Sequence, residues 1–210
     1  AEFDVLRAAL LAEGVRVCVG DDTPDPPRPD AVFPNNWVSF HADGTVVLYP
    51  MQPASRRPER RDEIVEQACR ELGFAMRRRL DLSAHEREGR FLEGTGSLVL
   101  DPRRRVAYAC LSPRTDLSLL NEWCALLDYT ALPFHATDAA GVPWYHTNVM
   151  MCLGTGFALV AAESIDARDR ERVLRSLADS GRELIEIDRA AVAQFAGNML
   201  ELSASDEALG

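Results

Sequence analysis

The fold is decided by one stretch, Leu98-Val-Leu-Asp-Pro-Arg-Arg-Arg-Val-Ala-Tyr-Ala-Cys-Leu111, and by the helical pattern that follows it. Two apolar runs flank the turn at Asp101-Pro-Arg, as in a β-hairpin. The helix begins after Asp116, a good N-cap residue, and continues to about Leu127. These residues predict a unit of two antiparallel strands followed by a helix.

The same unit recurs about three times, at intervals of roughly 50–60 residues, and a further strand completes it. A ββαβ repeat of this kind suggests modules arranged around an axis, and a continuous Rossmann sheet is the competing interpretation. No G-x-G-x-x-G motif follows a strand, which argues against dinucleotide binding. The other predicted elements are helices over 2–12, 59–72, 167–180 and 189–195, strands at Val15–Val19 and Leu184–Ile187, and hairpins over 31–49 and 147–162.

Composition excludes several classes of protein. The chain has 210 residues, of which 47% are hydrophobic and 27% charged, as in soluble globular proteins. A net charge of −10 argues against a nucleic-acid or membrane partner, and no apolar run reaches the roughly 20 residues that span a bilayer. The five cysteines fit free thiols in a reducing cytoplasm, where we expect the protein, and no Cys/His spacing suits a metal.

Four segments place polar residues inside otherwise apolar, strand-like sequence. Burying such groups costs several kcal/mol unless they find partners, so one segment alone is most simply a turn or a satisfied core contact. Four of them at strand ends predict a shared pocket. The segments are Phe33-Pro-Asn-Asn-Trp37, Phe91-Leu-Glu-Gly-Thr-Gly-Ser97, Leu111-Ser-Pro-Arg-Thr115 and Trp144-Tyr-His-Thr-Asn-Val-Met150.

In this order, the motifs resemble the guanidine-modifying superfamily, which includes arginine deiminases, dimethylarginine hydrolases and amidinotransferases. The resemblance covers residues 2–202 and is greatest to the citrulline-utilisation hydrolase branch, usually grouped with the amidinotransferases. It implies an α/β fold of ββαβ modules, the five-bladed α/β propeller or pentein. The residues that carry it are Pro29–Trp37, Leu48–Met51 with Arg56–Arg61, Leu92–Ser97, Ser112–Thr115, Tyr145–Met151 and Phe195–Leu202.

The resemblance implies covalent catalysis, in which a cysteine attacks the guanidino or ureido carbon and water then hydrolyses the intermediate. His146 matches the catalytic histidine and Glu93 the acidic residue that orients it. Arg114 matches the arginine that binds the substrate carboxylate, and Arg56 or Arg57 a second such arginine. Asp30 matches a substrate-contacting aspartate. The partner would be a small amino-acid substrate, and no metal or organic cofactor is needed.

Two asparagines differ from the arginine deiminase pattern. Asn36 and Asn148 stand where those enzymes carry aspartates that bind the guanidinium. A carboxylate would repel a ureido oxygen, whereas an amide can donate to that oxygen and accept from the ureido N–H. The amides therefore favour a neutral ureido group, as in citrulline. The alternatives are an arginine deiminase-like activity and that of the succinylarginine dihydrolases, whose reaction passes through a ureido intermediate.

The nucleophile is the part of the pattern that is missing. No cysteine follows the Gly-Asn-Met-Leu-Glu motif at 197–201, and none of the five matches the family nucleophile. We therefore expect residues 1–210 to form a single, incomplete propeller domain, with the nucleophile C-terminal to Gly210. The alternatives are a binding domain with the same pocket and a soluble α/β domain whose motifs are only structural.

Overall fold

The computed structural model describes residues 2–204, in which one module occurs three times. In each described sheet an antiparallel hairpin is followed by a helix and by a strand parallel to the second, so the predicted hairpin–helix–strand repeat is confirmed. The modules are β1 (Val38–Phe40), β2 (Thr45–Leu48), α2 (Asp62–Leu72) and β3 (Arg78–Asp81); β4 (Val99–Asp101), β5 (Val106–Cys110), α4 (Leu117–Leu127) and β6 (Thr130–Phe134); and β7 (Met151–Leu153), β8 (Phe157–Val160), α5 (Ala167–Ala178) and β9 (Glu183–Glu186).

The chain outside the three modules forms further helices and 3-10 segments. Beyond the three modules the described chain has helices α1 (Glu2–Ala12), α3 (Gly94–Ser97) and α6 (Arg189–Ala193), and the 3-10 segments η1 (Ala54–Glu59), η2 (Ser83–Glu88), η3 (Thr147–Val149) and η4 (Ala162–Ser164). Among them, α3 and η3 border the candidate site.

The second module shows why this sequence forms the unit. All five residues of β5 are buried, because β4 and β6 pair with its two edges and a hydrophobic cluster covers each of its two faces. A strand enclosed in this way is apolar throughout rather than alternating. The carboxylate of Asp116 accepts a hydrogen bond from the backbone N–H of Leu119, which caps α4 as the sequence predicts.

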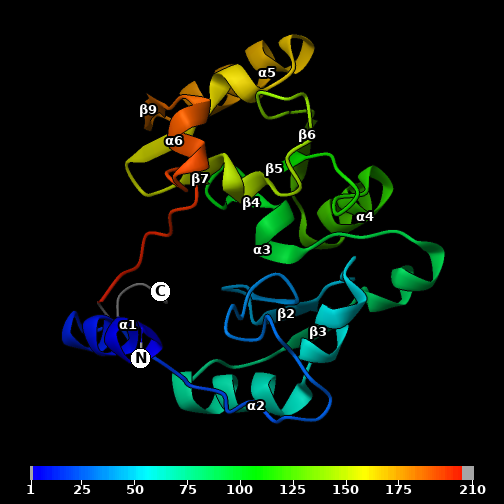
Figure 1. The fold of residues 1–210 in the computed structure, drawn as a ribbon, viewed down its shortest axis with the longest axis vertical. Coiled ribbons are helices and arrows are strands. Elements are labelled where there is room, and N and C mark those ends of the chain that lie inside the picture. The colour runs from blue at the N-terminus through cyan, green and yellow to red at the C-terminus, as the bar shows by residue number, and fades with distance from the viewer. Residues whose placement is uncertain (1, 205–210) are drawn as a thin grey trace.

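Hydrophobic cores lie between successive modules as well as within them. Val47 and Tyr49 of the first module pack in one cluster with Leu119 and Trp123 of α4, and the Trp123 indole N–H donates to the Tyr49 hydroxyl at 2.9 Å. A second cluster joins the second and third modules. Helices α2, α4 and α5 lie on the outer side of the resulting arc, and the sheets lie on its inner side (Figure 1). Each module is therefore buttressed by the next.

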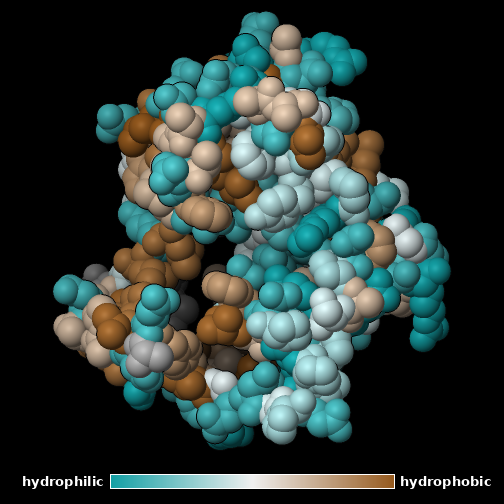
Figure 2. All heavy atoms as spheres, viewed as in Figure 1, coloured by the Kyte–Doolittle hydropathy of each residue, from teal (hydrophilic) through white to brown (hydrophobic). Residues whose placement is uncertain are grey.

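Helix α1 stands apart from this arrangement. None of its residues is buried, and Phe3 and Leu11 expose about half of their surface. Phe3 faces a largely apolar cavity of about 560 Å³ that Trp37 and Ile64 of the first module also line. In Figure 2 hydrophobic residues gather on both sides of the hollow between α1 and the modules.

Two predicted strands differ in the structure. Val15–Val19 was expected to be a strand but pairs with none; it runs beside α2, where the Gln67 amide donates to the carbonyl of Val19 at 3.0 Å. Thr147–Val149, expected to begin the third hairpin, forms η3 instead, and the hairpin starts at Met151. In the first case the Gln67 side chain satisfies one of the backbone groups that a neighbouring strand would otherwise have satisfied.

The fold class is α/β, as predicted. Within residues 2–204 the three sheets each have three strands and none closes on itself. The five-bladed propeller and the single domain over 1–210 remain predictions. Among the helices of the described residues, none combines the length and the apolar character needed to cross a membrane.

Candidate functional site

A buried pair, Glu93 and His146, forms the centre of the candidate site. Glu93 directly precedes α3, and His146 directly precedes η3. Nε2 of His146 lies 2.7 Å from Oε2 of Glu93, and the two side chains are 6% and 0% exposed. Because Nε2 faces a carboxylate it carries the proton, and Nδ1 has no hydrogen-bond partner among residues 2–204.

Glu93 is held as a carboxylate. Burial favours its neutral form, but the carboxylate accepts hydrogen bonds from His146 and from the backbone N–H of Gln52, and Arg114 lies 3.5 Å away. Together these contacts outweigh the desolvation, so the pKa of Glu93 lies below its ordinary value. An ionised Glu93 can fix the orientation of the His146 ring and stabilise its protonated form.

The glycines of the Leu92–Ser97 motif allow this approach. A Cβ atom on Gly94, which has a φ of 35°, would lie 2.6 Å from the carbonyl oxygen of Asn36. A Cβ atom on Gly96 would lie 2.7 Å from both Cε1 and Nδ1 of His146. No side chain fits at either position without displacing the site.

Asn36 occupies a left-handed backbone conformation, with a φ of 73°, and is almost fully buried. Asparagine tolerates this conformation better than most residues. The hydroxyl of Thr95 lies 3.4 Å from both the backbone nitrogen and the side-chain oxygen of Asn36. The turn after Glu93 therefore also holds the loop that carries Asn36.

These groups open onto one cavity of about 490 Å³. Six of the seven predicted site residues line it, although they come from segments far apart in the sequence. The seventh, Glu93, does not line the cavity but contacts His146, which does. The lining residues are Asp30, Asn36, Arg56, Arg114, His146 and Asn148 from the prediction, and Phe33, Asn35, Pro53, Tyr145, Val149, Phe195 and Asn198.

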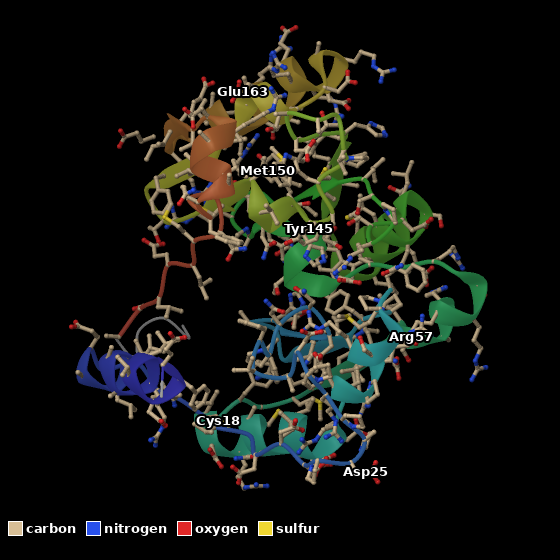
Figure 3. The ribbon with its side chains drawn as sticks, in the orientation of Figure 1. Cys18, Asp25, Arg57, Tyr145, Met150 and Glu163 are labelled. Carbon is tan, nitrogen blue, oxygen red and sulfur yellow. The ribbon has the colours of Figure 1, made fainter. Side chains whose placement is uncertain are left out.

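Of the two arginines that line the cavity, Arg114 has the more exposed side chain. Its side chain is 30% exposed, and its guanidinium lies over the ring of Tyr145 at 5.1 Å from the ring centre. The Tyr145 ring, labelled in Figure 3, also contacts the ring of His146 at 4.9 Å between centres. Tyr145 therefore contacts both the guanidinium of Arg114 and the imidazole of His146.

The guanidinium of Arg56 already forms hydrogen bonds with other groups of the protein. Its Nε and one terminal nitrogen bind the carboxylate of Glu59, and the same terminal nitrogen donates to the carbonyl of Phe33 at 2.9 Å. Arg57, the other residue considered for this role, points elsewhere and donates to the carbonyl of Met51. Of the two, only Arg56 lines the cavity.

Several residues at the site were not predicted individually. Phe33, Tyr145, Phe195 and Asn198 lie within the motifs but look like ordinary apolar or polar residues in the sequence. Asn198 donates from its amide to the carbonyl of Asn148 at 3.2 Å and so joins the C-terminal segment to the cavity. Only the shared motif could have indicated these residues.

The cysteines lie away from this cavity. All five fall within the described residues, and none lines it. Burial raises the pKa of the Cys110 thiol to about 12, which makes it a poor nucleophile. The nucleophile expected beyond Gly210 lies outside the described residues. Within residues 2–204 no group of three or more His, Cys, Asp or Glu side chains could hold a metal ion.

Comparison with known proteins places the chain in a family. The family described as "N,N dimethylarginine dimethylhydrolase, eukaryotic" matches residues 1–209. None of the curated proteins matches the sequence.

Solved structures share the fold. ArgZ, an arginine dihydrolase from the ornithine-ammonia cycle in cyanobacteria, matches with a TM-score of 0.72 and 19% identity over 96% of this chain and 30% of its own. AgrE, in complex with ornithine and NAD⁺, matches at 0.73 and 21% over 96% of this chain and 27% of its own. A dimethylarginine dimethylaminohydrolase adduct matches at 0.52 and 14% over 92% of this chain and 84% of its own.

The coverage is unequal. The chain spans less than a third of the ArgZ and AgrE chains and 67% of the N-terminal domain of ArgZ. At these identities the structural matches show a common α/β fold of the pentein type, whereas the family match extends over nearly every residue. The chain therefore belongs to the eukaryotic N,N dimethylarginine dimethylhydrolase family, whose members are C–N bond hydrolases of the guanidine-modifying superfamily.

Proposed function

We propose that the protein hydrolyses a C–N bond of a ureido or guanidino group in an amino acid, and that conversion of citrulline to ornithine is favoured. The observation that carries the proposal is the buried Glu93–His146 pair at a cavity that Arg114 and the amides of Asn36 and Asn148 also line. Membership of the dimethylarginine hydrolase family and the shared fold with arginine dihydrolases support the reaction class. The family match does not separate the citrulline-utilisation branch from the others.

In the proposed reaction a thiolate attacks the ureido carbon, and the bond from that carbon to the δ-nitrogen breaks. His146 protonates the departing amine, which leaves as ornithine, and then removes a proton from the water that hydrolyses the carbamoyl thioester. The products are ornithine and carbamate, which decomposes to ammonia and carbon dioxide. Nδ1 of His146 is the free ring nitrogen, and Glu93 stabilises the imidazolium through Nε2.

Charged groups of the cavity would hold the substrate backbone. Arg114 is the proposed partner of the α-carboxylate, because its guanidinium is partly exposed in the cavity. Asp30, also at the cavity, is a proposed contact for the substrate. Arg56 would contribute less directly, since Glu59 and the Phe33 carbonyl already use part of its guanidinium.

A binding domain is the second candidate. The observation in its favour is that no cysteine of the chain lies at the cavity, so the covalent reaction needs a thiol that residues 2–204 do not provide there. Such a domain would bind citrulline or arginine through the same residues without turning them over.

The test is incubation of the complete protein with citrulline, arginine or succinylarginine, followed by measurement of ammonia and of ornithine. The proposal expects ornithine from citrulline. Release of ammonia and citrulline from arginine would indicate a deiminase, and turnover of succinylarginine alone would indicate a succinylarginine dihydrolase. Saturable binding without any product would favour the binding domain.

His146→Ala is expected to abolish turnover and leave folding nearly intact. General acid–base groups contribute about 10²–10⁴-fold, and His146 would serve both half-reactions. His135→Ala is the matched control, because His135 is exposed and does not line the cavity. Loss of the thermal unfolding transition with normal specific activity per folded molecule would identify His146 as structural.

The amides are expected to set the preference for substrate charge. Asn36→Asp with Asn148→Asp should weaken citrulline and favour arginine by roughly 10–100-fold, because hydrogen bonds to charged groups contribute about 1.5–3 kcal/mol each. Aspartate also tolerates the backbone conformation of Asn36. The measurement is the ratio of kcat/KM for the two substrates, with Asn121→Asp on the exposed face of α4 as control. An unchanged ratio would contradict the charge argument.

A further inference from the structure

We propose that Ser97 is a positioning residue that holds Glu93, Arg114 and His146 in register with one another. The inference rests on the proposed function only in taking these three residues as the site. Ser97 is the last residue of the short helix α3, is fully buried, and does not line the cavity. It can therefore act on a reaction only through its neighbours.

The hydroxyl of Ser97 joins two of the three residues directly. It accepts a hydrogen bond from the backbone N–H of Glu93 at 2.9 Å and donates one to the carbonyl of Arg114 at 2.9 Å. It also accepts a hydrogen bond from the hydroxyl of Thr115 at 2.8 Å. One hydroxyl thus uses its donor and two acceptor positions to tie the acidic residue to the segment that carries the cation.

The backbone of Ser97 reaches the third residue. Its carbonyl accepts a hydrogen bond of 2.6 Å from the hydroxyl of Thr147, which directly follows His146. The Thr147 hydroxyl in turn accepts from the backbone N–H of Cys110, at the end of β5. The segment with His146 is therefore fastened to the same turn as Glu93.

Removal of the hydroxyl would leave polar groups unsatisfied at this junction. In Ser97→Ala the buried N–H of Glu93 and the hydroxyl of Thr115 lose their acceptor, and no solvent reaches position 97. Buried donors rearrange to recover a partner, because an unpaired buried donor is costly. The shift would displace Glu93 from His146, which at present lie 2.7 Å apart.

Ser164 provides a matched control. It is also buried, and among the described residues its hydroxyl has no hydrogen-bond partner. Ser164→Ala therefore removes a buried hydroxyl without removing a hydrogen bond, in a segment that does not line the cavity. Any effect common to both variants reflects the loss of a buried oxygen rather than the loss of the junction.

The first measurement is the titration of the Glu93 carboxyl by carbon NMR, which needs no turnover. Contacts from His146 and Arg114 lower the pKa of Glu93, so a displaced carboxyl in Ser97→Ala should titrate at higher pH than in the wild type or in Ser164→Ala. In Ser97→Cys, which retains a weak hydrogen-bonding group, the pKa of Glu93 should lie between its values in Ser97→Ala and in the wild type. Ser97→Cys also serves as the test if Ser97→Ala does not fold.

The second measurement is turnover of citrulline. Misplacement of catalytic groups by about 1 Å can reduce rates by 10²-fold, so we expect kcat/KM to fall roughly 10–100-fold in Ser97→Ala and to be unchanged in Ser164→Ala. A wild-type protein that turns over no substrate would contradict the proposed function, while the titration would still decide on Ser97. A Glu93 titration in folded Ser97→Ala or Ser97→Cys that equals the one in Ser164→Ala would overturn the inference.

Discussion

At the scale of the residue, the candidate site depends on positions that lack a side chain. Gly94 and Gly96 let the turn after Glu93 approach the Asn36 loop and the His146 ring more closely than any Cβ atom would allow. Asn36 in turn adopts a conformation that favours glycine and asparagine. The distance between the acid and the imidazole is therefore set largely by backbone approach.

Gly96→Ala is expected to reduce activity with little change in the fold. The new Cβ atom would lie 2.7 Å from Cε1 and Nδ1 of His146, so the ring must move and its free nitrogen is obstructed. We expect kcat/KM to fall at least about 10-fold, since small misplacements of reacting groups are costly. Gly156→Ala is the matched control, because nothing lies within 4 Å of a Cβ atom there. Equal activity of the two variants would contradict this account.

The sequence could predict which side chains carry the chemistry but not all that holds them. Glu93, Arg114 and His146 stand out because charged or titratable residues interrupt apolar segments. Ser97 and Tyr145 do not stand out, since a serine or tyrosine in such a segment has many ordinary explanations. Each also contacts Arg114, which lies more than 15 positions away in the sequence, and local patterns do not contain such contacts.

At the scale of the element, the sequence predicts best where neighbouring residues decide the structure. The helix after Asp116 and the hairpin of β4 and β5 follow from capping and turn residues. The third strands of the first two modules, β3 and β6, were not located from the sequence. β3 is mostly polar and β6 contains Pro133, so each depends on pairing with the strand of an earlier hairpin.

Asp116→Ala is expected to destabilise α4 and, with it, the second module. The carboxylate of Asp116 accepts the Leu119 N–H at 2.9 Å, and loss of such a cap lowers the free energy of unfolding by about 1 kcal/mol. Asp116→Asn should retain most of this stability, because asparagine caps helices about as well. The measurement is denaturant unfolding of the three proteins. Equal destabilisation by both substitutions would assign the effect to charge rather than to capping.

At the scale of the whole molecule, the site lies where modules meet. Asn36 precedes the first hairpin, Glu93 lies between the first and second modules, Arg114 follows β5, and His146 precedes the third hairpin. A repeated module therefore brings the same kind of position, the entrance or exit of a hairpin, to a common cavity. The relative placement of the modules is thus a condition for the site.

A buried ion pair fixes the second module to the third. The carboxylate of Asp101 in β4 binds both terminal nitrogens of Arg182, at 2.8 and 3.3 Å, and Nε of Arg182 donates to the carbonyl of Gly154. Both side chains are almost fully buried. Burial favours the neutral form of Asp101, but Arg182 and backbone N–H groups outweigh it and hold the pKa of Asp101 below its ordinary value.

Arg182→Met should lower the free energy of unfolding by about 3–5 kcal/mol at neutral pH, because it leaves the Asp101 carboxylate buried without its partner. A depressed carboxyl pKa contributes stability above its unfolded value, about 3.9, and the contribution is lost as pH falls through the folded value. The difference between wild type and variant should therefore shrink as pH falls from 7 toward 3. Denaturant unfolding across this range measures the difference, with Arg175→Met, from the exposed pair with Glu171, as control.

Adding Asp101→Asn to Arg182→Met should recover much of the lost stability, since no buried charge then lacks a partner. A deficit that stays constant with pH, or that matches the control, would show that the bond between the modules depends on packing rather than on this pair.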